Sequence, residues 1–238
     1  MTAPPHNYHW ACGQTVWWDT SDSQDRYNSN LNNYRTADQL RQLGYVDNPI
    51  AYTFNSQGFR TAEFDHAVDA VCFGCSFTMG TGLHAQHTWP AQLQSIAGLT
   101  VLNLGHAGSS NDTAYRMARH YLPLLRPRYA LWLQTDRHRL ELLDDVQSCS
   151  VNLMAGDHSD KIYGTNSFVQ QWWVSDSNQL LNLEKNTRAF KSLCSELDIQ
   201  CEITPRESVV TIDLARDLKH PGRNSMQALA LAFAKALT

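Results

Sequence analysis

From Val68 to the end of the chain, short apolar runs alternate with longer segments whose apolar residues recur at helical spacing. The runs are typical of buried strands, and the spaced pattern is typical of amphipathic helices. The predicted strands are 68–73, 100–104, 128–134, 199–204 and 209–213, and the predicted helices are 88–97, 112–125, 186–197 and 224–237. Strands that alternate with helices over short links pair in parallel and are covered on both faces. The pattern therefore predicts an α/β fold, a three-layer α/β/α sandwich around a central, mostly parallel sheet of about five strands.

Residues 1–65 differ from the rest of the chain, because they are rich in Asn, Asp, Ser, Tyr and Trp and lack long apolar periodicity. Within them, 36–43 has the pattern of a short helix, and 51–54 has that of a strand before a turn. We expect this segment to be an arm that packs on the main domain, 66–238. Inside the main domain, 135–184 breaks the alternation, and we expect an insertion there, near the edge of the sheet that binds ligands.

Composition and charge exclude several classes of protein. The 238 residues include 19 Lys and Arg against 23 Asp and Glu, a net charge of −4, whereas a dedicated nucleic-acid binder carries a basic stripe. No apolar run approaches the about 20 residues of a membrane span, and no signal peptide is visible. We therefore expect a cytoplasmic location, where the six cysteines are reduced. Neither Cys nor His spacing matches a four-ligand zinc site, so we expect no metal.

The strand predicted at 68–73 runs directly into Gly74-Cys75-Ser76-Phe77-Thr78. The carboxyl ends of parallel strands form the ligand crevice of such a sheet, so Ser76 can point its hydroxyl group into that crevice. Backbone N–H groups at the start of the following segment can face a developing oxyanion. The alternative is that Ser76 only caps a turn or a helix.

Asp217 and His220 lie three residues apart, just before the last predicted helix. At this spacing both side chains can share one face of a turn. The carboxylate can then accept from one imidazole nitrogen and leave the other nitrogen free as a base, the relation found in Ser-His-Asp triads. The alternative is a solvated loop in which Asp213 and Arg216 are competing partners.

A polar loop, Asn103-Leu-Gly105-His-Ala-Gly108-Ser-Ser-Asn111-Asp112, separates the second predicted strand from its helix. Gly108 allows a backbone N–H group to approach a ligand oxygen, and the Asn111 amide can donate a hydrogen bond. The alternative is an ordinary strand–helix turn with Asn111 as the N-cap. The spacing of Gly105 and Gly108 is only part of a dinucleotide-binding fingerprint, because the third glycine is missing.

The three motifs occur in the order that is found in SGNH or GDSL-like hydrolases, a family of esterases and lipases that the segment 68–237 resembles. The resemblance implies a flavodoxin-like α/β/α fold of the SGNH hydrolase type. It implies that Ser76 is the nucleophile, His220 the general base and Asp217 the residue that orients His220. It also implies that the N–H groups of Ser76 and Gly108 form the oxyanion hole, and that no cofactor is needed.

The chain departs from this family after the third strand, where members usually have Gly-x-Asn-Asp and the Asn side chain completes the oxyanion hole. Here the nearest residues are Thr135 and Asp136, and an ionised Asp would repel an oxyanion. Asn111 in the neighbouring loop is then the candidate third donor, unless the hole has backbone donors only. We expect Cys75 and Phe77, together with Thr135 and Asp136, to line the substrate pocket.

The expected function is hydrolysis of carboxylic esters by a serine hydrolase, through an acyl-enzyme on Ser76. The expected substrate is an acyl or acetyl ester of a small molecule, a lipid or a carbohydrate. One alternative is an acyltransferase that uses the same triad on a glycan. The other is a glycan- or lipid-binding protein in which the change after the third strand has removed catalysis.

Overall fold

The computed structural model describes residues 9–144, 149–153 and 167–237, so parts of the predicted arm and insertion lie outside the described residues. Its main sheet has four parallel strands in the order β4-β3-β5-β8. These strands are β3 (Ala70–Phe73), β4 (Val101–Asn103), β5 (Tyr129–Leu133) and β8 (Gln200–Thr204). Helices cover both faces of this sheet, so the predicted α/β/α sandwich is confirmed.

The fifth predicted strand, 209–213, is wrong, because these described residues form no strand. The backbone N–H groups of Ile212 and Asp213 donate to the Ser225 hydroxyl group instead of to a neighbouring strand. Val210 and Ile212 are more than half exposed, at 66% and 59%. The apolar run that predicted a strand is therefore a surface segment that anchors the start of the last helix.

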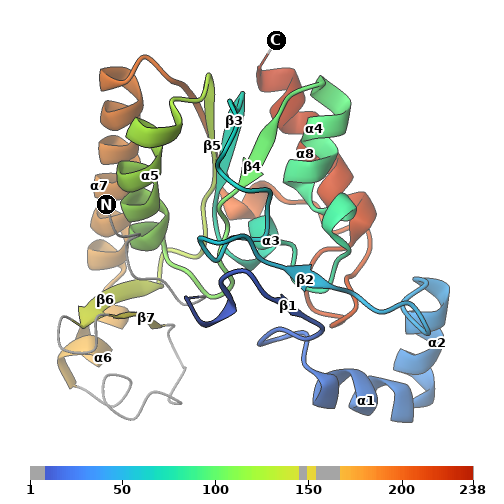
Figure 1. The fold of residues 1–238 in the computed structure, drawn as a ribbon. Coiled ribbons are helices and arrows are strands. Elements are labelled where there is room, and N and C mark those ends of the chain that lie inside the picture. The colour runs from blue at the N-terminus through green and yellow to red at the C-terminus, as the bar shows by residue number, and fades with distance from the viewer. Residues whose placement is uncertain (1–8, 145–148, 154–166, 238) are drawn as a thin grey trace.

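Two pairs of helices form the outer layers (Figure 1). Helices α5 (Asn111–Leu125) and α7 (Asp176–Glu196) pack together on one face of the sheet. On the other face, α4 (Trp89–Ala97) packs against α8 (Arg223–Ala236). Because α7 begins at Asp176, the sheet-covering part of the chain resumes earlier than the predicted end of the insertion at 184.

The strands are buried on both faces because their side chains alternate between two hydrophobic clusters. In β3, Ala70 and Cys72 belong to the cluster beneath α4 and α8, whereas Val71 and Phe73 belong to the cluster beneath α5 and α7. In the first cluster, the Trp89 ring stacks on the Phe233 ring with 4.5 Å between the centroids. This double burial explains why the strands read as continuous apolar runs rather than as alternating ones.

Several elements lie beyond the carboxyl ends of the strands, at the lower edge of Figure 1. The short helix α3 (Ser76–Met79) follows β3 directly, and the antiparallel hairpin of β6 and β7 lies below α5. The other elements that follow β3 in the chain are β6 (Leu140–Asp144), β7 (Cys149–Leu153), α6 (Ser167–Trp173) and the 3₁₀ helices Ala85–His87 and Arg206–Ser208. The carboxyl edge of the sheet is therefore built from loops and short elements.

The N-terminal segment forms short strands and helices of its own beside this edge. Strand β1 (Thr15–Val16) pairs antiparallel with β2 (Tyr52–Thr53), and between them lie α1 (Gln24–Asn32) and α2 (Tyr34–Gln42). A 3₁₀ turn, His9–Ala11, precedes them. Helix α2 matches the helix predicted at 36–43, whereas α1 was not predicted. No residue of α1 is buried, so the helix lacks the apolar periodicity that would predict it.

A buried ion pair ties this segment to the loop that carries Asp217 and His220. The Arg216 guanidinium donates to both Asp22 carboxylate oxygens, with a shortest distance of 2.7 Å, and the two side chains are 3% and 1% exposed. The Tyr52 hydroxyl group donates to the same carboxylate at 2.5 Å and accepts from the Gly82 N–H at 2.7 Å. The buried charges are thus matched by hydrogen bonds, as a stable interior requires.

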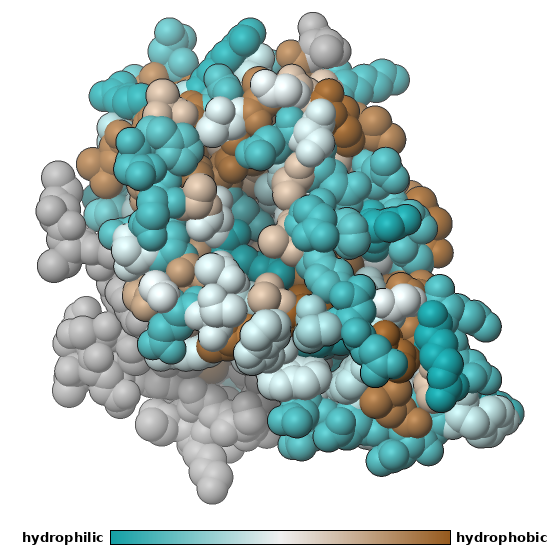
Figure 2. All heavy atoms as spheres, turned by 45° about the vertical axis from the view of Figure 1, so that its right-hand side comes forward, coloured by the Kyte–Doolittle hydropathy of each residue, from teal (hydrophilic) through white to brown (hydrophobic). Residues whose placement is uncertain are grey.

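Figure 2 shows that one face of the molecule is largely hydrophilic, with hydrophobic residues in separate small groups. None of the helices in the described part of the chain has the length and apolar character that a membrane span needs. The large apolar side chains are instead concentrated in the two clusters on either side of the sheet.

We expect Asp22→Ala to lower the free energy of unfolding by about 3–5 kcal/mol, because it leaves the Arg216 charge buried and unpaired. The control is Asp38→Ala, which removes the same charge from an ion pair with Arg41 whose side chains are more than 60% exposed. That control should change the free energy by less than about 1 kcal/mol. Urea unfolding of the two variants measures both values, and equal effects would contradict this account.

Candidate active site

The turn that carries Ser76 requires a glycine at position 74. Gly74 has φ +152°, and a Cβ there would lie 2.2 Å from Thr78 Oγ1 and 2.7 Å from the Leu133 carbonyl oxygen. The Gly74 carbonyl oxygen accepts from the His106 N–H at 3.0 Å and from the Ser109 hydroxyl group at 3.1 Å. The chain can therefore leave β3 sharply and begin α3 at Ser76 while it stays tied to the loop after β4.

Asn103 joins the same loop to α3. Its side-chain nitrogen donates to the Thr78 carbonyl oxygen at 2.8 Å, and its side-chain oxygen accepts from the Gly105 N–H at 3.0 Å. The side chain is buried and satisfied at both ends. The first and second sequence motifs are therefore held together by hydrogen bonds as well as by the pairing of β3 with β4.

The loop before α8 is folded around the Asp217 carboxylate. Asp217 Oδ1 accepts from the backbone N–H groups of Lys219 and His220, each at 3.0 Å. Leu218 has φ +54°, a left-handed conformation that bulky side chains rarely adopt. Below this turn, the Asp213 carboxylate accepts from the N–H groups at the start of α8. The turn thus brings His220 back over Asp217.

Gly82 allows this loop to approach the loop that follows α3. Its φ is +76°, and a Cβ at this position would lie 2.9 Å from the Ala215 Cβ and 3.1 Å from the Arg216 nitrogen. The Gly82 carbonyl oxygen accepts from the Arg216 N–H at 3.0 Å. This close backbone contact fixes the distance between the segment that carries Ser76 and the segment that carries Asp217.

The structure brings the three predicted residues together in one chain of hydrogen bonds. His220 Nε2 lies 2.8 Å from Ser76 Oγ, and His220 Nδ1 lies 2.5 Å from Asp217 Oδ2. Ser76 is 6% exposed and Asp217 is 2% exposed, so both are shielded from water. An ionised carboxylate only accepts, so Nδ1 carries a proton and the neutral ring presents Nε2 as the acceptor for the Ser76 hydroxyl group.

The Asp217 carboxyl group is ionised at neutral pH in spite of its burial. Burial raises its pKa, but the hydrogen bonds from His220 and from the backbone N–H groups of Lys219 and His220 outweigh that effect and lower the pKa overall. A lowered pKa means that the charged form stabilises the fold above the pKa of the unfolded chain. This stabilisation is lost as the pH falls below the pKa of the unfolded chain and through the lower pKa of the folded state.

The two predicted backbone donors of the oxyanion hole, the N–H groups of Ser76 and Gly108, have no hydrogen-bond acceptor among the described residues. Ser76 is the first residue of α3, where helical N–H groups have no partner within the helix. Gly108 lies in the loop after β4, and the space where its Cβ would lie is open. Both N–H groups are therefore available to a ligand oxygen.

Asn111 has partners that the sequence did not predict. Its side-chain nitrogen donates to the Thr135 carbonyl oxygen and its side-chain oxygen accepts from the Thr135 N–H, both at 3.0 Å. The alternative that Asn111 caps the helix is wrong, because Ser110 is the N-cap of α5 and accepts from the Thr113 N–H. One hydrogen of the Asn111 amide is thus used on Thr135, and its role as a third oxyanion donor stays a prediction.

Two of the expected pocket residues, Phe77 and Asp136, are joined to the site through Arg206. The Phe77 ring lies edge-on to the His220 ring at 5.6 Å, and the Arg206 guanidinium lies 4.7 Å from the Phe77 centroid. Arg206 forms an ion pair with Asp136, and Arg139 lies 3.5 Å from the same carboxylate. The charge of Asp136, expected to repel an oxyanion, is therefore balanced by two arginines.

The other two expected pocket residues, Cys75 and Thr135, are buried. The Cys75 sulfur lies 3.9 Å from Ser76 Oγ, and its free thiol group follows the glycine turn. The Thr135 hydroxyl group has no hydrogen-bond partner among the described residues, whereas its backbone is held by Asn111. That Cys75 and Thr135 line a substrate pocket stays a prediction.

Sequence reasoning missed the contacts that the N-terminal segment makes with this site. The Ser21 hydroxyl group donates to Asp217 Oδ2 at 3.2 Å. The residues that were weighed as competitors for Asp217 have other partners, because Arg216 pairs with Asp22 and Asp213 binds the start of α8. No local pattern marks Ser21 or Asp22, since Asp217 and Arg216, their partners in this loop, lie more than 190 residues away.

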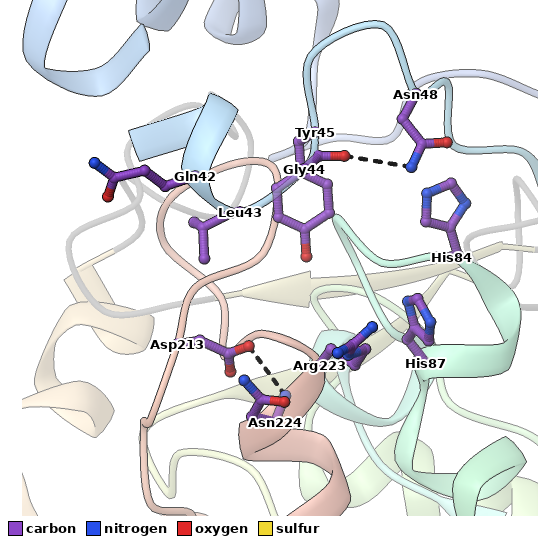
Figure 3. A pocket seen from close by; sticks show the side chains of 10 residues that line it. All are labelled: Gln42, Leu43, Gly44, Tyr45, Asn48, His84, His87, Asp213, Arg223 and Asn224. Atoms are coloured by element: carbon purple, nitrogen blue, oxygen red, sulfur yellow. Dashed lines mark hydrogen bonds between the residues drawn. The ribbon is translucent and has the colours of Figure 1, made fainter. Parts of the chain in front are cut away.

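A separate hollow of about 330 Å³ lies between α2, the loop after α3 and the start of α8 (Figure 3). His84 and His87 line it together with Arg223, and it contains none of Ser76, Asp217 and His220. Burial and the nearby arginine charges of Arg60 and Arg223 lower the pKa of these histidines, so their rings are neutral at pH 7. In the described part of the chain, no group of three or more His, Cys, Asp and Glu side chains is placed to hold a metal ion.

No family model matches the chain, and no curated protein sequence does. Among solved structures, it is similar to a GDSL-like lipase from Bacteroides thetaiotaomicron VPI-5482, at 15% identity and a TM-score of 0.32, over 71% of this chain and 64% of that one. It is similar to Est24, a carbohydrate acetylesterase from Sinorhizobium meliloti, at 11% identity and a TM-score of 0.37, over 71% and 98% of the two chains.

A third similar structure is a carbohydrate esterase family 2 enzyme with a carbohydrate-binding domain from Corynascus thermopiles, at 14% identity and a TM-score of 0.39. That match covers 74% of this chain and 68% of the other. The α/β/α layering that the sequence motifs imply is the one described above.

We expect Gly82→Ala to slow the reaction of Ser76 with a fluorophosphonate, a reagent for activated serines, by about a hundredfold. The reason is that the added Cβ meets the backbone of the Asp217 loop and moves that loop away from α3. The matched control is Gly98→Ala, at φ +65° with nothing within 4 Å of the added Cβ. The control should lose about 1 kcal/mol of stability and keep the wild-type rate. Equal rates in the two variants would contradict the role given to Gly82.

Proposed function

We propose that this chain is a serine hydrolase that cleaves carboxylic esters through a covalent acyl-enzyme on Ser76. The observation that carries the proposal is the hydrogen-bonded chain from Ser76 Oγ to His220 to the buried Asp217. In this arrangement a nucleophile lies within reach of a base, and a third group orients that base. A serine that only caps a helix needs no imidazole at 2.8 Å, so the contact favours the catalytic role over the structural alternative.

In the first half of the proposed reaction, His220 Nε2 takes the proton from Ser76 Oγ as this oxygen attacks the ester carbonyl carbon. The negative charge that develops on the carbonyl oxygen is stabilised by the N–H groups of Ser76 and Gly108. Asp217 holds the imidazolium that forms. The tetrahedral intermediate then expels the alcohol, which takes its proton from His220, and the acyl group stays on Ser76.

In the second half, a water molecule attacks the acyl carbonyl carbon while His220 takes one of its protons. The second tetrahedral intermediate expels Ser76 Oγ, which regains its proton from His220, and the carboxylic acid leaves. An acyltransferase differs only in this step, because a sugar hydroxyl group replaces water. A rate that rises with added sugar acceptor, together with a new acylated product, distinguishes the transferase from the hydrolase.

The surroundings of the triad support an activated serine rather than a degenerate binding site. Asp217 is ionised and buried, so its effect on His220 is not weakened by water. The change from the usual Asn after the third strand leaves two backbone donors, and loss of one donor typically slows such a reaction by about a hundredfold to a thousandfold. The proposed enzyme therefore remains active with the donors that it has.

We expect a fluorophosphonate to add once to the wild-type chain and not at all to Ser76→Ala, as read by intact mass. His220→Ala should react far more slowly, because triad members act as a unit. The control is Ser95→Ala, an exposed position on α4, which should react like the wild type. Labelling of Ser76→Ala at the wild-type rate would show that another residue reacts. If the wild type reacts, a panel of esters from short to long acyl chains then identifies the substrate.

A further inference from the structure

The segment that connects β1 to α1, residues 17–22, lies against both loops that carry the triad. Thr81 lies in the loop just after α3, and its hydroxyl group donates to the Asp19 carboxylate at 3.2 Å. Arg216 lies in the loop that carries Asp217, and its guanidinium group donates to the Trp17 carbonyl oxygen at 3.0 Å. This one segment therefore contacts the Ser76 side and the Asp217 side of the site.

Two neighbouring residues of this segment form hydrogen bonds with two neighbouring residues of the loop that carries Asp217. Ser21 donates to Asp217, and Asp22 accepts from Arg216. The Asp22–Arg216 pair is nearly fully buried, so it anchors the segment at this point of the loop. The Arg216 guanidinium also lies 4.3 Å from the Trp18 ring centroid, which adds a second contact to the same anchor. Ser21 is thus held beside Asp217 by its neighbours.

We propose that Ser21 is a positioning residue for the Asp217 carboxylate, so that the N-terminal segment completes the active site. The proposal rests on the proposed function, because it assumes that Asp217 orients His220 for catalysis. The catalytic loop itself supplies both donors to Asp217 Oδ1, the N–H groups of Lys219 and His220. Oδ2, the oxygen that faces the His220 ring, has one donor besides that ring among the described residues, and this donor is Ser21.

The position of Oδ2 decides where the His220 ring lies. An ionised carboxylate cannot donate, so the Ser21 hydroxyl group is the donor, and its hydrogen bond to a charged acceptor is of the stronger kind. With a second donor on Oδ2, rotation of the carboxylate would break hydrogen bonds at both oxygens. Without Ser21, the His220 ring is the one remaining donor to Oδ2 among the described residues. The carboxylate and the imidazole can then move together, so Asp217 no longer fixes the position of the ring.

Three variants test this role in the full chain. Ser21→Ala removes the hydroxyl group and should slow labelling of Ser76 by a fluorophosphonate about two- to tenfold, the range of one net hydrogen bond. Ser21→Thr keeps a hydroxyl group and should restore most of the rate. The control is Ser23→Ala, which removes the N-cap of α1 two residues away and should keep the wild-type rate. Thermal unfolding of each variant confirms that it is folded.

A second readout separates positioning from a merely structural effect. We expect the proton in the short hydrogen bond between His220 Nδ1 and Asp217 Oδ2 to give a proton NMR resonance far downfield, and its position would report this hydrogen bond without any turnover. We expect the resonance to move in Ser21→Ala and to stay unchanged in Ser23→Ala. A Ser21→Ala variant with the wild-type rate and an unmoved resonance overturns the proposal. If the wild type itself is not labelled, the proposed function fails, and the resonance still tests the contact of Ser21 with Asp217.

Discussion

The buried negative charge of Asp217 is the constraint around which the other parts of the site are arranged. A carboxylate that is 2% exposed is stable only when hydrogen-bond donors replace the water that it has lost. Two of its donors come from the turn that carries it, one from the His220 ring and one from Ser21. The carboxylate whose hydrogen bonds must be satisfied for folding is thus also the group that orients the His220 imidazole in the proposed mechanism.

The loops at the carboxyl ends of the strands are held to one another by hydrogen bonds to backbone groups, and not only by the contacts of Ser76, His220 and Asp217. Gly74 accepts hydrogen bonds from the loop after β4, and Gly82 accepts from the Asp217 loop. Asn111 ties the start of α5 to the backbone at Thr135, just beyond β5. Because such contacts fix the loops relative to one another, they would supply the preorganisation that the proposed acyl transfer needs. The side chains of the triad then need no further adjustment to meet.

The sequence predicted the sandwich because strands buried on both faces and helices with one apolar face leave distinct periodic patterns. The same reasoning failed where the apolar pattern of a segment does not match the burial of its residues. Segment 209–213 is apolar but partly exposed and bonded to Ser225, and α1 is helical but buries no residue. The order of the three motifs resembles that of SGNH or GDSL-like hydrolases, and this resemblance predicted that Ser76, His220 and Asp217 meet. The loops after the strands of a parallel sheet lie at one edge, which agrees with that contact.

The partners of single polar residues could not be predicted in this way. Asp22 and Ser21 resemble solvated residues of a polar arm, and their partners Arg216 and Asp217 follow more than 190 residues later. The sequence predicts that Asp136 repels an oxyanion, and it does not show that Arg206, on a different loop, balances this charge. Such pairings depend on how the loops are placed in space, which the periodicity of each segment does not contain. They are also the contacts that distinguish this site from a generic triad.

The most direct test of the account is a crystal structure of the chain after reaction with an alkyl fluorophosphonate. We expect the phosphorus atom to be bonded to Ser76 Oγ, with His220 Nε2 still within hydrogen-bond distance of that oxygen. The phosphonyl oxygen should accept from the N–H groups of Ser76 and Gly108, and a hydrogen bond from the Asn111 amide would identify the third donor. An adduct on another residue, or a phosphonyl oxygen that faces neither N–H group, would contradict the account.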